Sequence, residues 1–241
     1  MKSVDVHDLI TIAKIAGEAI LKVYEKPFCV SNKADNSPVT KADTNANAII
    51  CRELSKYGYP IISEEILLLN YNERKNWSDF FIVDPLDGTK EFISKNGNFT
   101  VNIAFLKNCK PFLGVIYAPV SKVAYYTDGF KAYKNGKTIS WSKSDTLRVV
   151  MSQNHSNNDT KDFVRDLGEV HTISIGSSLK FCLIAEGKAD IYPRLSTTCE
   201  WDTAAAHAIL KAIGKNIYVY GCEEELKYNK ESLLNPWFIA K

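Results

Sequence analysis

The sequence is poor in the features that mark secreted and membrane proteins. It has six cysteines among 241 residues, and no two of them form a C-x-x-C pair. In a chain of this length, scattered cysteines indicate reduced core residues of an intracellular protein, not a disulfide framework or a zinc site. No window reaches the roughly 18 apolar residues of a spanning helix. The N-terminus lacks a charged region followed by a long apolar run, so we expect no signal peptide and no transmembrane segment.

An excess of charge of either sign is also missing. The chain has 30 Lys and Arg residues against 28 Asp and Glu residues, which gives a net charge of +2 at pH 7. This balance requires neither a polymeric nucleic acid nor an anionic membrane as a partner. We expect a cytoplasmic protein, and the sequence leaves open a loose association with the cytoplasmic side of the inner membrane.

The chain also lacks repeats, low-complexity segments and a Pro- or Ser-rich linker, so residues 1–241 are expected to form a single compact domain. The first half, 1–145, is predicted to be rich in antiparallel strands, and the second half, 146–241, to alternate strands and helices. This pattern predicts a layered α/β fold with two sheets. The expected helices are 9–23, 40–56, 160–167, 177–186 and 201–213. The expected strands are 60–63, 80–83, 99–106, 112–117, 123–126, 131–139, 147–151, 171–175, 191–193 and, last, 217–220. Residues 26–38 are predicted to be a loop.

The most informative segment is Asp84-Pro85-Leu86-Asp87-Gly88-Thr89. The preceding apolar strand is expected to end at Val83, because Pro85 cannot donate a ladder hydrogen bond. A sharp turn there would direct both carboxylates and the Leu86 carbonyl into one volume, and these are ligands that Mg²⁺ prefers. The amides of Gly88 and Thr89 would face an anion if a helix began there. Taken alone, this pattern is more often a solvated loop.

Three further acidic sites follow strands or begin helices. Glu64 and Glu65 follow the strand 60–63, Asp43 lies in the first turns of its helix, and Asp202 begins an alanine-rich helix. Each is also compatible with a simple helix start, where acidic side chains interact favourably with the helix dipole. The small residues 204–206 would let the helix of Asp202 approach another element closely.

Together these motifs resemble the inositol monophosphatase-like superfamily of metal-dependent, lithium-sensitive phosphatases. The resemblance covers nearly the full length and implies the layered sugar-phosphatase fold of that superfamily. Its marks are Pro38–Asp43, Ser63–Glu65, Asp84–Thr89 and Trp201–Ala205. One departure is Ala206, where Gly is common; we expect no loss of the metal site there, because Ala is a good helix former.

Within the superfamily, the chain looks like the bacterial 3′(2′),5′-bisphosphate nucleotidases. It carries Lys90-Glu91-Phe92, where inositol monophosphatases usually carry Thr-Asn-Phe. The segments 98–104, 174–181 and 185–194 agree with the same branch.

The resemblance implies a centre of two or three Mg²⁺ ions and assigns its ligands. The first ion would be held by Glu64, Asp84 and the Leu86 carbonyl. The second would be held by Asp84, Asp87 and Asp202. Thr89, hydrogen-bonded to Asp43, would orient the attacking water and take its proton, with Glu64 counted among the catalytic groups. The residues expected to meet the substrate are Glu64, Leu86, Asp87, Gly88, Thr89, Asp202, Lys180 and Arg194.

Four residues are candidates for the nucleoside end of the site. Lys180 and Arg194 are candidates for the 5′-phosphate, with solvated surface charge as the alternative for each. Tyr192 or Phe181 could stack on adenine or belong to the core. His207 is interpreted as a helix-packing residue, not a ligand.

The implied reaction is hydrolysis of the 3′-phosphate of adenosine 3′,5′-bisphosphate, a small-molecule substrate, to AMP and phosphate by a metal-activated water, in support of sulfur assimilation. Two alternatives remain: an inositol or sugar monophosphatase on the same fold, and a non-catalytic nucleotide-binding protein.

Overall fold

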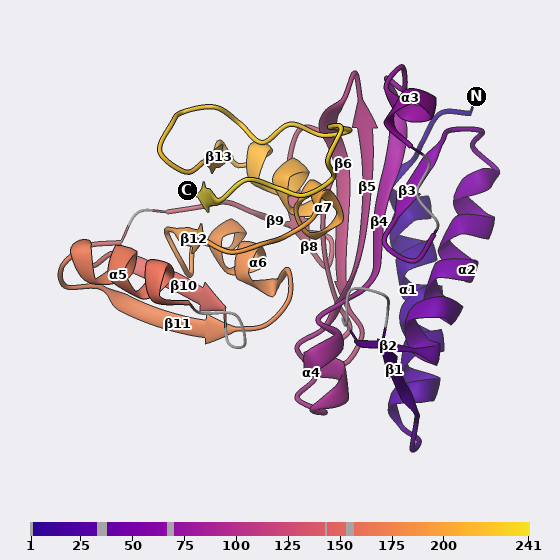
Figure 1. Ribbon diagram of the computed structural model, residues 1–241, viewed down its shortest axis with the longest axis horizontal. Coiled ribbons are helices and arrows are strands. Elements are labelled where there is room, and N and C mark those ends of the chain that lie inside the picture. The colour runs from indigo at the N-terminus through magenta and orange to yellow at the C-terminus, as the bar shows by residue number, and fades with distance from the viewer. Residues whose placement is uncertain (1, 33–37, 67–69, 143, 153–156) are drawn as a thin grey trace.

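A computed structural model describes residues 2–32, 38–66, 70–142, 144–152 and 157–241. A seven-stranded sheet with strand order β3-β4-β5-β6-β7-β8-β9 forms its centre (Figure 1). β3 and β4 are parallel, and the following neighbours are antiparallel. The strands are β3 (Ile61–Ser63), β4 (Phe80–Asp87), β5 (Thr100–Lys107), β6 (Lys110–Ala118), β7 (Val123–Thr127), β8 (Ala132–Lys134) and β9 (Lys137–Ile139).

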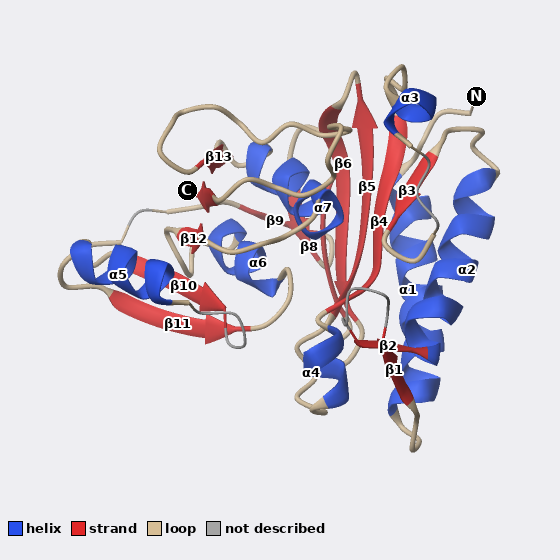
Figure 2. Ribbon diagram, viewed as in Figure 1, coloured by secondary structure: helices blue, strands red, loops and turns tan. Residues whose placement is uncertain are grey.

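Two long helices, α1 (Val6–Tyr24) and α2 (Lys41–Ser55), cover one face of this sheet (Figure 2). Asp5 caps α1 by accepting a hydrogen bond from the His7 amide at 2.9 Å, and Thr40 caps α2. Their apolar faces pack in one buried cluster against odd-numbered side chains of β4 and β5, such as Phe81 and Ile103. Both expected helices are thus confirmed. They could be predicted because their apolar period is a local feature of the sequence.

The opposite face of the sheet packs against α7 (Glu200–Lys211), with α6 (Leu179–Ala185) beside it. Even-numbered side chains of β4 and β5 point to this side. The backbone of α7 lies so close to β6 that a methyl group at Gly114 would overlap the Ala205 carbonyl. The close approach predicted from the alanines 204–206 is therefore confirmed. It brings the first turn of α7 to the end of β4.

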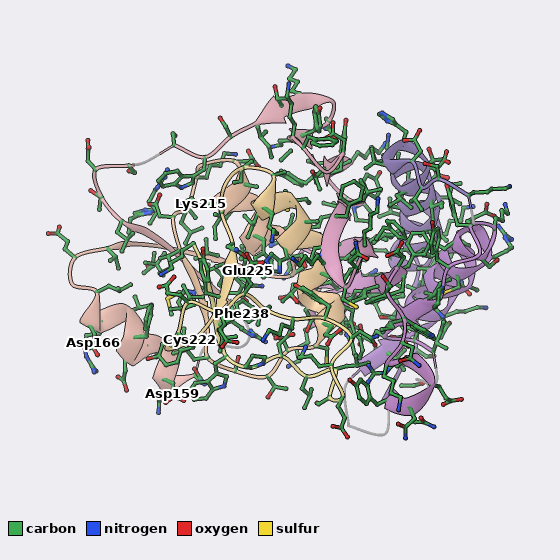
Figure 3. The ribbon with its side chains drawn as sticks, turned by 90° about the horizontal axis from the view of Figure 1, so that it is seen from above. Asp159, Asp166, Lys215, Cys222, Glu225 and Phe238 are labelled. Carbon is green, nitrogen blue, oxygen red and sulfur yellow. The ribbon has the colours of Figure 1, made fainter. Side chains whose placement is uncertain are left out.

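A second sheet region extends beyond α6 and α7. β10 (Arg148–Ser152) pairs in parallel with β11 (His171–Ile175), and β14 (Phe238–Ala240) lies between β12 (Tyr192–Arg194) and β13 (Ile217–Val219). A bridge between Val149 and Ile191 joins the two groups of strands. Helix α5 (Asn158–Asp166) packs nearby, with Asp166 at the outer edge and Phe238 toward the interior (Figure 3). The expected layered α/β fold is confirmed.

Several local predictions were wrong. Part of the expected loop 26–38 is a strand: β1 (Val30–Asn32) pairs with β2 (Pro38–Thr40), while 33–37 lie outside the described residues. The expected strand 131–139 is two strands, β8 and β9, separated by a turn at Asn135 and Gly136 with positive φ. The last strand is β14, not 217–220. The short helices α3 (Tyr71–Arg74) and α4 (Thr89–Ile93) were not predicted.

The described cysteines form no disulfide with one another, and most of them are not the core residues that were expected. Cys182 is buried, whereas Cys29 and Cys222 are exposed. In the part of the chain that the structure describes, none of the helices has the length and apolar character needed to cross a bilayer.

Candidate active site

Strand β4 presents two acidic side chains on one face because it is irregular between them. In a regular strand, residues three apart point to opposite faces. Here Asp84 pairs with Asn102 and Asp87 pairs with Thr100, so three residue steps on β4 oppose two on β5. This extra residue is a β-bulge, and a bulge tolerates Pro85, which has no N–H. The predicted strand end at Val83 was therefore wrong, and the bulge does what the turn was expected to do.

Leu86 anchors the bulge from the opposite side. Its side chain is only 2% exposed and packs in the apolar cluster beneath α1 and α2, while its amide donates a hydrogen bond to Asp84 Oδ1 at 3.0 Å. Gly88 then adopts φ = 94°, a conformation that glycine reaches without strain. Helix α4 begins at the next residue, Thr89. The helix start on which the expected phosphate-facing amides depend is thus present.

Carboxylates from three elements converge at this point. Asp84, Asp87 and Asp202 each offer an oxygen within 4.8 Å of the others. Asp202 comes from the first turn of α7, where its Oδ2 accepts a hydrogen bond from the Cys199 amide at 2.7 Å. Glu64 follows β3 and is hydrogen-bonded to Asp84. The four acidic residues predicted as metal ligands are therefore brought together.

The carboxylates destabilise one another's charged forms. Burial raises the pKa of Asp84 well above its usual range, and the charges of Glu64, Asp87 and Asp202 raise it further. Burial and the neighbouring carboxylates also raise the pKa of Asp202 to about 7. A divalent cation would reverse this repulsion, because an opposite charge favours the ionised form. Hard oxygen donors in this number fit Mg²⁺. The donor set therefore fits the metal that the resemblance implies.

The expected pair of Thr89 and Asp43 is present beside the cluster. Thr89 donates its hydroxyl hydrogen to Asp43 Oδ1 at 3.3 Å, and the same hydroxyl lies 3.5 Å from the Leu86 carbonyl. Asp43 Oδ2 accepts hydrogen bonds from the amide and hydroxyl of Thr40, at 2.8 and 2.7 Å. The capping box of α2 thus fixes this carboxylate.

Glu64, Asp84, Asp87 and Asp202 form what we call the acid cluster, and it opens into a pocket of about 430 Å³. Two buried cations, Lys180 and Arg194, line it together with the exposed Lys90, and each of the two is at most 9% exposed. The alternative of solvated surface charge is therefore wrong for both. The residues that line the pocket are Glu64, Asp87, Gly88, Thr89, Lys90, Glu91, Ser152, Ser177, Ser178, Lys180, Phe181, Tyr192, Arg194, Thr198, Asp202, Thr203 and Phe238.

Lys180 has a lowered pKa, and Arg194 has a buried donor without a hydrogen bond to any described residue. Lys180 donates to the Ser177 carbonyl at 2.6 Å, and burial lowers its pKa to about 8, an effect that Asp87 partly opposes. Arg194 donates to the Thr197 carbonyl at 3.1 Å, but its buried Nε makes no hydrogen bond with any described residue. A buried cation with an unused donor is suited to an anionic ligand.

Phe181, Tyr192 and His207 are buried, and the first two belong to the core cluster while one side of each also lines the pocket. Phe181 and Tyr192 are 4% and 2% exposed and pack edge to face, with ring centroids 5.0 Å apart, beside Phe238. This packing supports the core interpretation over stacking on adenine. His207 is buried and hydrogen-bonded to Tyr228 and Asn216, which agrees with its interpretation as a packing residue.

Sequence reasoning missed several polar residues of the site. Ser178 donates to Asp87 Oδ2 from its amide at 2.6 Å and from its hydroxyl at 2.5 Å, and Asn102 donates to the same oxygen at 3.2 Å. The Gly176-Ser177-Ser178 segment between β11 and α6 was a usable signal, because small polar residues at strand ends are common in sites. Nothing local distinguishes Asn102 from other strand residues.

Comparison with known proteins agrees with this geometry. Residues 2–237 match the inositol monophosphatase family. The chain is 46% identical over 236 residues to the 3′(2′),5′-bisphosphate nucleotidase CysQ of Escherichia coli strain K12, covering 94% of this chain and 95% of that protein. It is 44% identical to the protein of the same name from Buchnera aphidicola, covering 95% and 90% of the two chains.

Solved structures give the same picture. The crystal structure of CysQ from Bacteroides thetaiotaomicron, a bacterial member of the family, superposes with a TM-score of 0.88 at 44% identity and covers 98% of this chain and 96% of that one. The suhB protein of Bartonella henselae shares the fold, with a TM-score of 0.82 at 24% identity over 97% of this chain and 92% of that one. This chain belongs to the inositol monophosphatase family.

Proposed function

We propose that this protein is a Mg²⁺-dependent 3′(2′),5′-bisphosphate nucleotidase. It hydrolyses the 3′-phosphate of adenosine 3′,5′-bisphosphate to AMP and phosphate, and so supports sulfur assimilation. The observation that carries the proposal is that one pocket contains both the acid cluster and two buried cations, Lys180 and Arg194. A substrate with two phosphates would occupy both. The full-length similarity to proteins named as bisphosphate nucleotidases supports the same substrate class.

Two or three Mg²⁺ ions would be held by the acid cluster. The first would be held by Glu64, Asp84 and the Leu86 carbonyl, and the second by Asp84, Asp87 and Asp202. When bound, the metal supplies Lewis-acid charge to the phosphoryl oxygens and lowers the pKa of its water.

The pair of Thr89 and Asp43 is proposed to prepare the attacking water. Because the Thr89 hydroxyl donates to Asp43, its oxygen lone pair is left free to accept a hydrogen from water. The proton can then pass toward the Asp43 carboxylate, which Thr40 holds in place. The amides of Gly88 and Thr89 would bind the transferring phosphate. This arrangement needs no covalent intermediate.

Lys180 and Arg194 are proposed to bind the 5′-phosphate. Both cations lie in the pocket wall, and Arg194 retains an unused buried donor. An inositol or sugar monophosphate has no second phosphate, so it would leave these buried cations unpaired, which is unfavourable. This argument favours the nucleotidase over a monophosphatase, the second candidate.

We also propose that residues 1–241 form one phosphatase unit. The pocket and its acids come from both halves of the chain: Asp43 and Asp87 lie before 145, and Lys180 and Asp202 after it. Neither half contains a complete site. We propose a cytoplasmic location, where small nucleotide substrates are available.

The test is a comparison of three substrates with Mg²⁺ present: adenosine 3′,5′-bisphosphate, adenosine 3′-monophosphate and inositol 1-phosphate. We expect kcat/KM for the bisphosphate to exceed the other two by about 100-fold or more, since a site built for a polar group discriminates strongly against its absence. Comparable rates on inositol 1-phosphate would support the monophosphatase instead. Unchanged turnover in Asp87→Asn would contradict the metal mechanism. The activity would then come from a contaminating phosphatase, and the protein itself would be a non-catalytic binding protein.

A further inference from the structure

Two buried neutral side chains converge on one oxygen of Asp87. Ser178, 1% exposed, donates from its amide at 2.6 Å and its hydroxyl at 2.5 Å to Asp87 Oδ2. Asn102, also 1% exposed, donates from Nδ2 to the same oxygen at 3.2 Å and to the Ser178 hydroxyl oxygen at 2.9 Å. The three groups form a closed triangle of hydrogen bonds.

This triangle divides the roles of the two Asp87 oxygens. A carboxylate oxygen has about two lone-pair sites, and Oδ2 already receives three donors. It therefore has little capacity left for a metal ion. Oδ1 is the oxygen that remains for the acid cluster.

From this geometry we propose that Ser178 and Asn102 are a positioning pair that fixes Asp87 and so sets the metal affinity of the site. The proposal rests on the Mg²⁺ site of the proposed function. Neither residue touches the substrate in this role; both act through Asp87. Partners that orient a metal-binding carboxylate commonly matter nearly as much as the ligand itself.

The local structure around Ser178 supports a positioning role over a simple helix cap. Ser178 is the N-cap residue of α6, yet its side chain makes no capping hydrogen bond. Its hydroxyl is directed to Asp87, and it lies 3.3 Å from the Asp202 carbonyl. The pair therefore connects β5 and α6 to β4, which carries Asp87. Ser178 also connects α6 to α7, which carries Asp202.

The segment before Ser178 is held in a conformation that packing must maintain. Ser177 has φ = 50°, a left-handed conformation that is unfavourable for a non-glycine residue. A methyl group at Gly176 would overlap the Glu91 carboxylate, so the segment lies tightly against α4. Lys180 also donates a hydrogen bond to the Ser177 carbonyl. These contacts fix the direction of the Ser178 amide.

Asn102 supplies an independent observation. Its Oδ1 is buried and makes no hydrogen bond with any described residue. An unsatisfied buried acceptor is destabilising, so an apolar side chain would serve stability better at this position. The amide of Asn102 is useful for what Nδ2 does, and both of its hydrogen bonds go to the triangle.

The experiment measures Mg²⁺ binding by calorimetry in the absence of substrate, for wild type, Ser178→Ala, Asn102→Ser and the double variant. We expect each single variant to weaken Mg²⁺ binding by about 10- to 100-fold, as for other residues that support metal ligands. The double variant should weaken it by less than the product of the two, because both act through one oxygen. At saturating Mg²⁺, KM for the bisphosphate should stay near the wild-type value.

The control is Thr160→Ala on α5, which removes another buried hydroxyl, hydrogen-bonded to Asn157 Oδ1 at 2.7 Å, away from the pocket lining. It should leave Mg²⁺ affinity unchanged. If wild type binds Mg²⁺ and the folded variants bind it equally well, the positioning role is overturned while the proposed function stands. If wild type binds no Mg²⁺, both are overturned. Asn102→Ser provides the same readout if Ser178→Ala does not fold.

Discussion

The Thr89 hydroxyl donates a hydrogen bond to Asp43 Oδ1 at 3.3 Å and so joins the first residue of α4 to the first turn of α2. Asp43 has little freedom to turn away, because Thr40 donates twice to its other oxygen. The pair is therefore preorganised before any substrate binds. Preorganised hydrogen bonds of this kind contribute to catalysis without a reorganisation cost at the moment of reaction.

Thr89→Ala removes the hydroxyl proposed to orient and deprotonate water. We expect kcat to fall by about 10²- to 10⁴-fold, the usual contribution of general base catalysis. Mg²⁺ affinity measured by calorimetry should change little, because the Thr89 hydroxyl is not among the proposed metal ligands. Thr89→Ser should recover most of the activity.

The matched control is Thr44→Ala, which removes an exposed hydroxyl on α2 that donates a hydrogen bond to the Lys41 carbonyl at 3.2 Å. This variant should retain wild-type kcat. A Thr89→Ala enzyme with kcat within threefold of wild type would exclude the proposed proton path.

Lys180 should give the reaction a basic limit. Burial lowers its pKa to about 8, so the free enzyme loses this positive charge above that pH. We expect kcat/KM for adenosine 3′,5′-bisphosphate to decline above pH 8, since the neutral amine binds the 5′-phosphate weakly. Hydrolysis of adenosine 3′-monophosphate, which lacks that phosphate, should not show this decline. Both profiles are measured at saturating Mg²⁺.

Lys180→Arg separates the lysine from other ionisations. Arginine keeps its charge at any accessible pH, so the decline above pH 8 should disappear even if the variant is slower overall. The same decline in the variant, or in both substrates, would assign it to another group.

Lithium inhibition is expected from membership of the family. Li⁺ at millimolar concentration should inhibit bisphosphate hydrolysis at fixed Mg²⁺, with Na⁺ at equal ionic strength as the control. Insensitivity would count against the assigned metal centre without affecting the fold.

Features carried by local pattern could be read from the sequence. The apolar period predicted α1 and α2, and four ordered acidic motifs predicted which carboxylates meet. The mechanism of that meeting was not predicted. Pro85 indicated the end of a strand, whereas pairing of β4 with β5 continues through a bulge to Asp87. Pairing with a partner strand outweighed the local preference of one residue.

Features that depend on distant contacts could not be read. Lys180 and Arg194 are charged residues, and only the tertiary structure shows that they line a pocket instead of facing solvent. Ser178 meets Asp87 across 91 positions of sequence. β14 is three residues long and exists because it lies between β12 and β13. A strand of three residues is too short to be predicted from the alternation of apolar and polar residues.

Gly114→Ala should weaken both the fold and the metal site. The added methyl would overlap the Ala205 carbonyl of α7, and overpacking of this kind costs about 1–3 kcal/mol. Since α7 carries Asp202, its displacement should also weaken Mg²⁺ binding. Thermal unfolding and calorimetry measure the two effects. Gly58→Ala, whose methyl would meet open space but strain a φ of 78°, should lower stability alone. Wild-type Mg²⁺ affinity in Gly114→Ala would mean that α7 does not shift.

His207 should make the protein sensitive to mild acid. Burial lowers its pKa to about 4, although the hydrogen bond with Asn216 opposes the shift. Between pH 4 and the unfolded value of about 6.5, the unfolded chain binds a proton that the folded one does not, so the free energy of unfolding falls as pH falls. The loss approaches about 3 kcal/mol near pH 4. The free energy of unfolding, measured by urea unfolding at several pH values in this range, should depend less steeply on pH in His207→Gln than in wild type. In His171→Gln, which changes an exposed histidine, the pH dependence should match wild type. Parallel slopes for wild type and His207→Gln would show that His207 is not the group responsible.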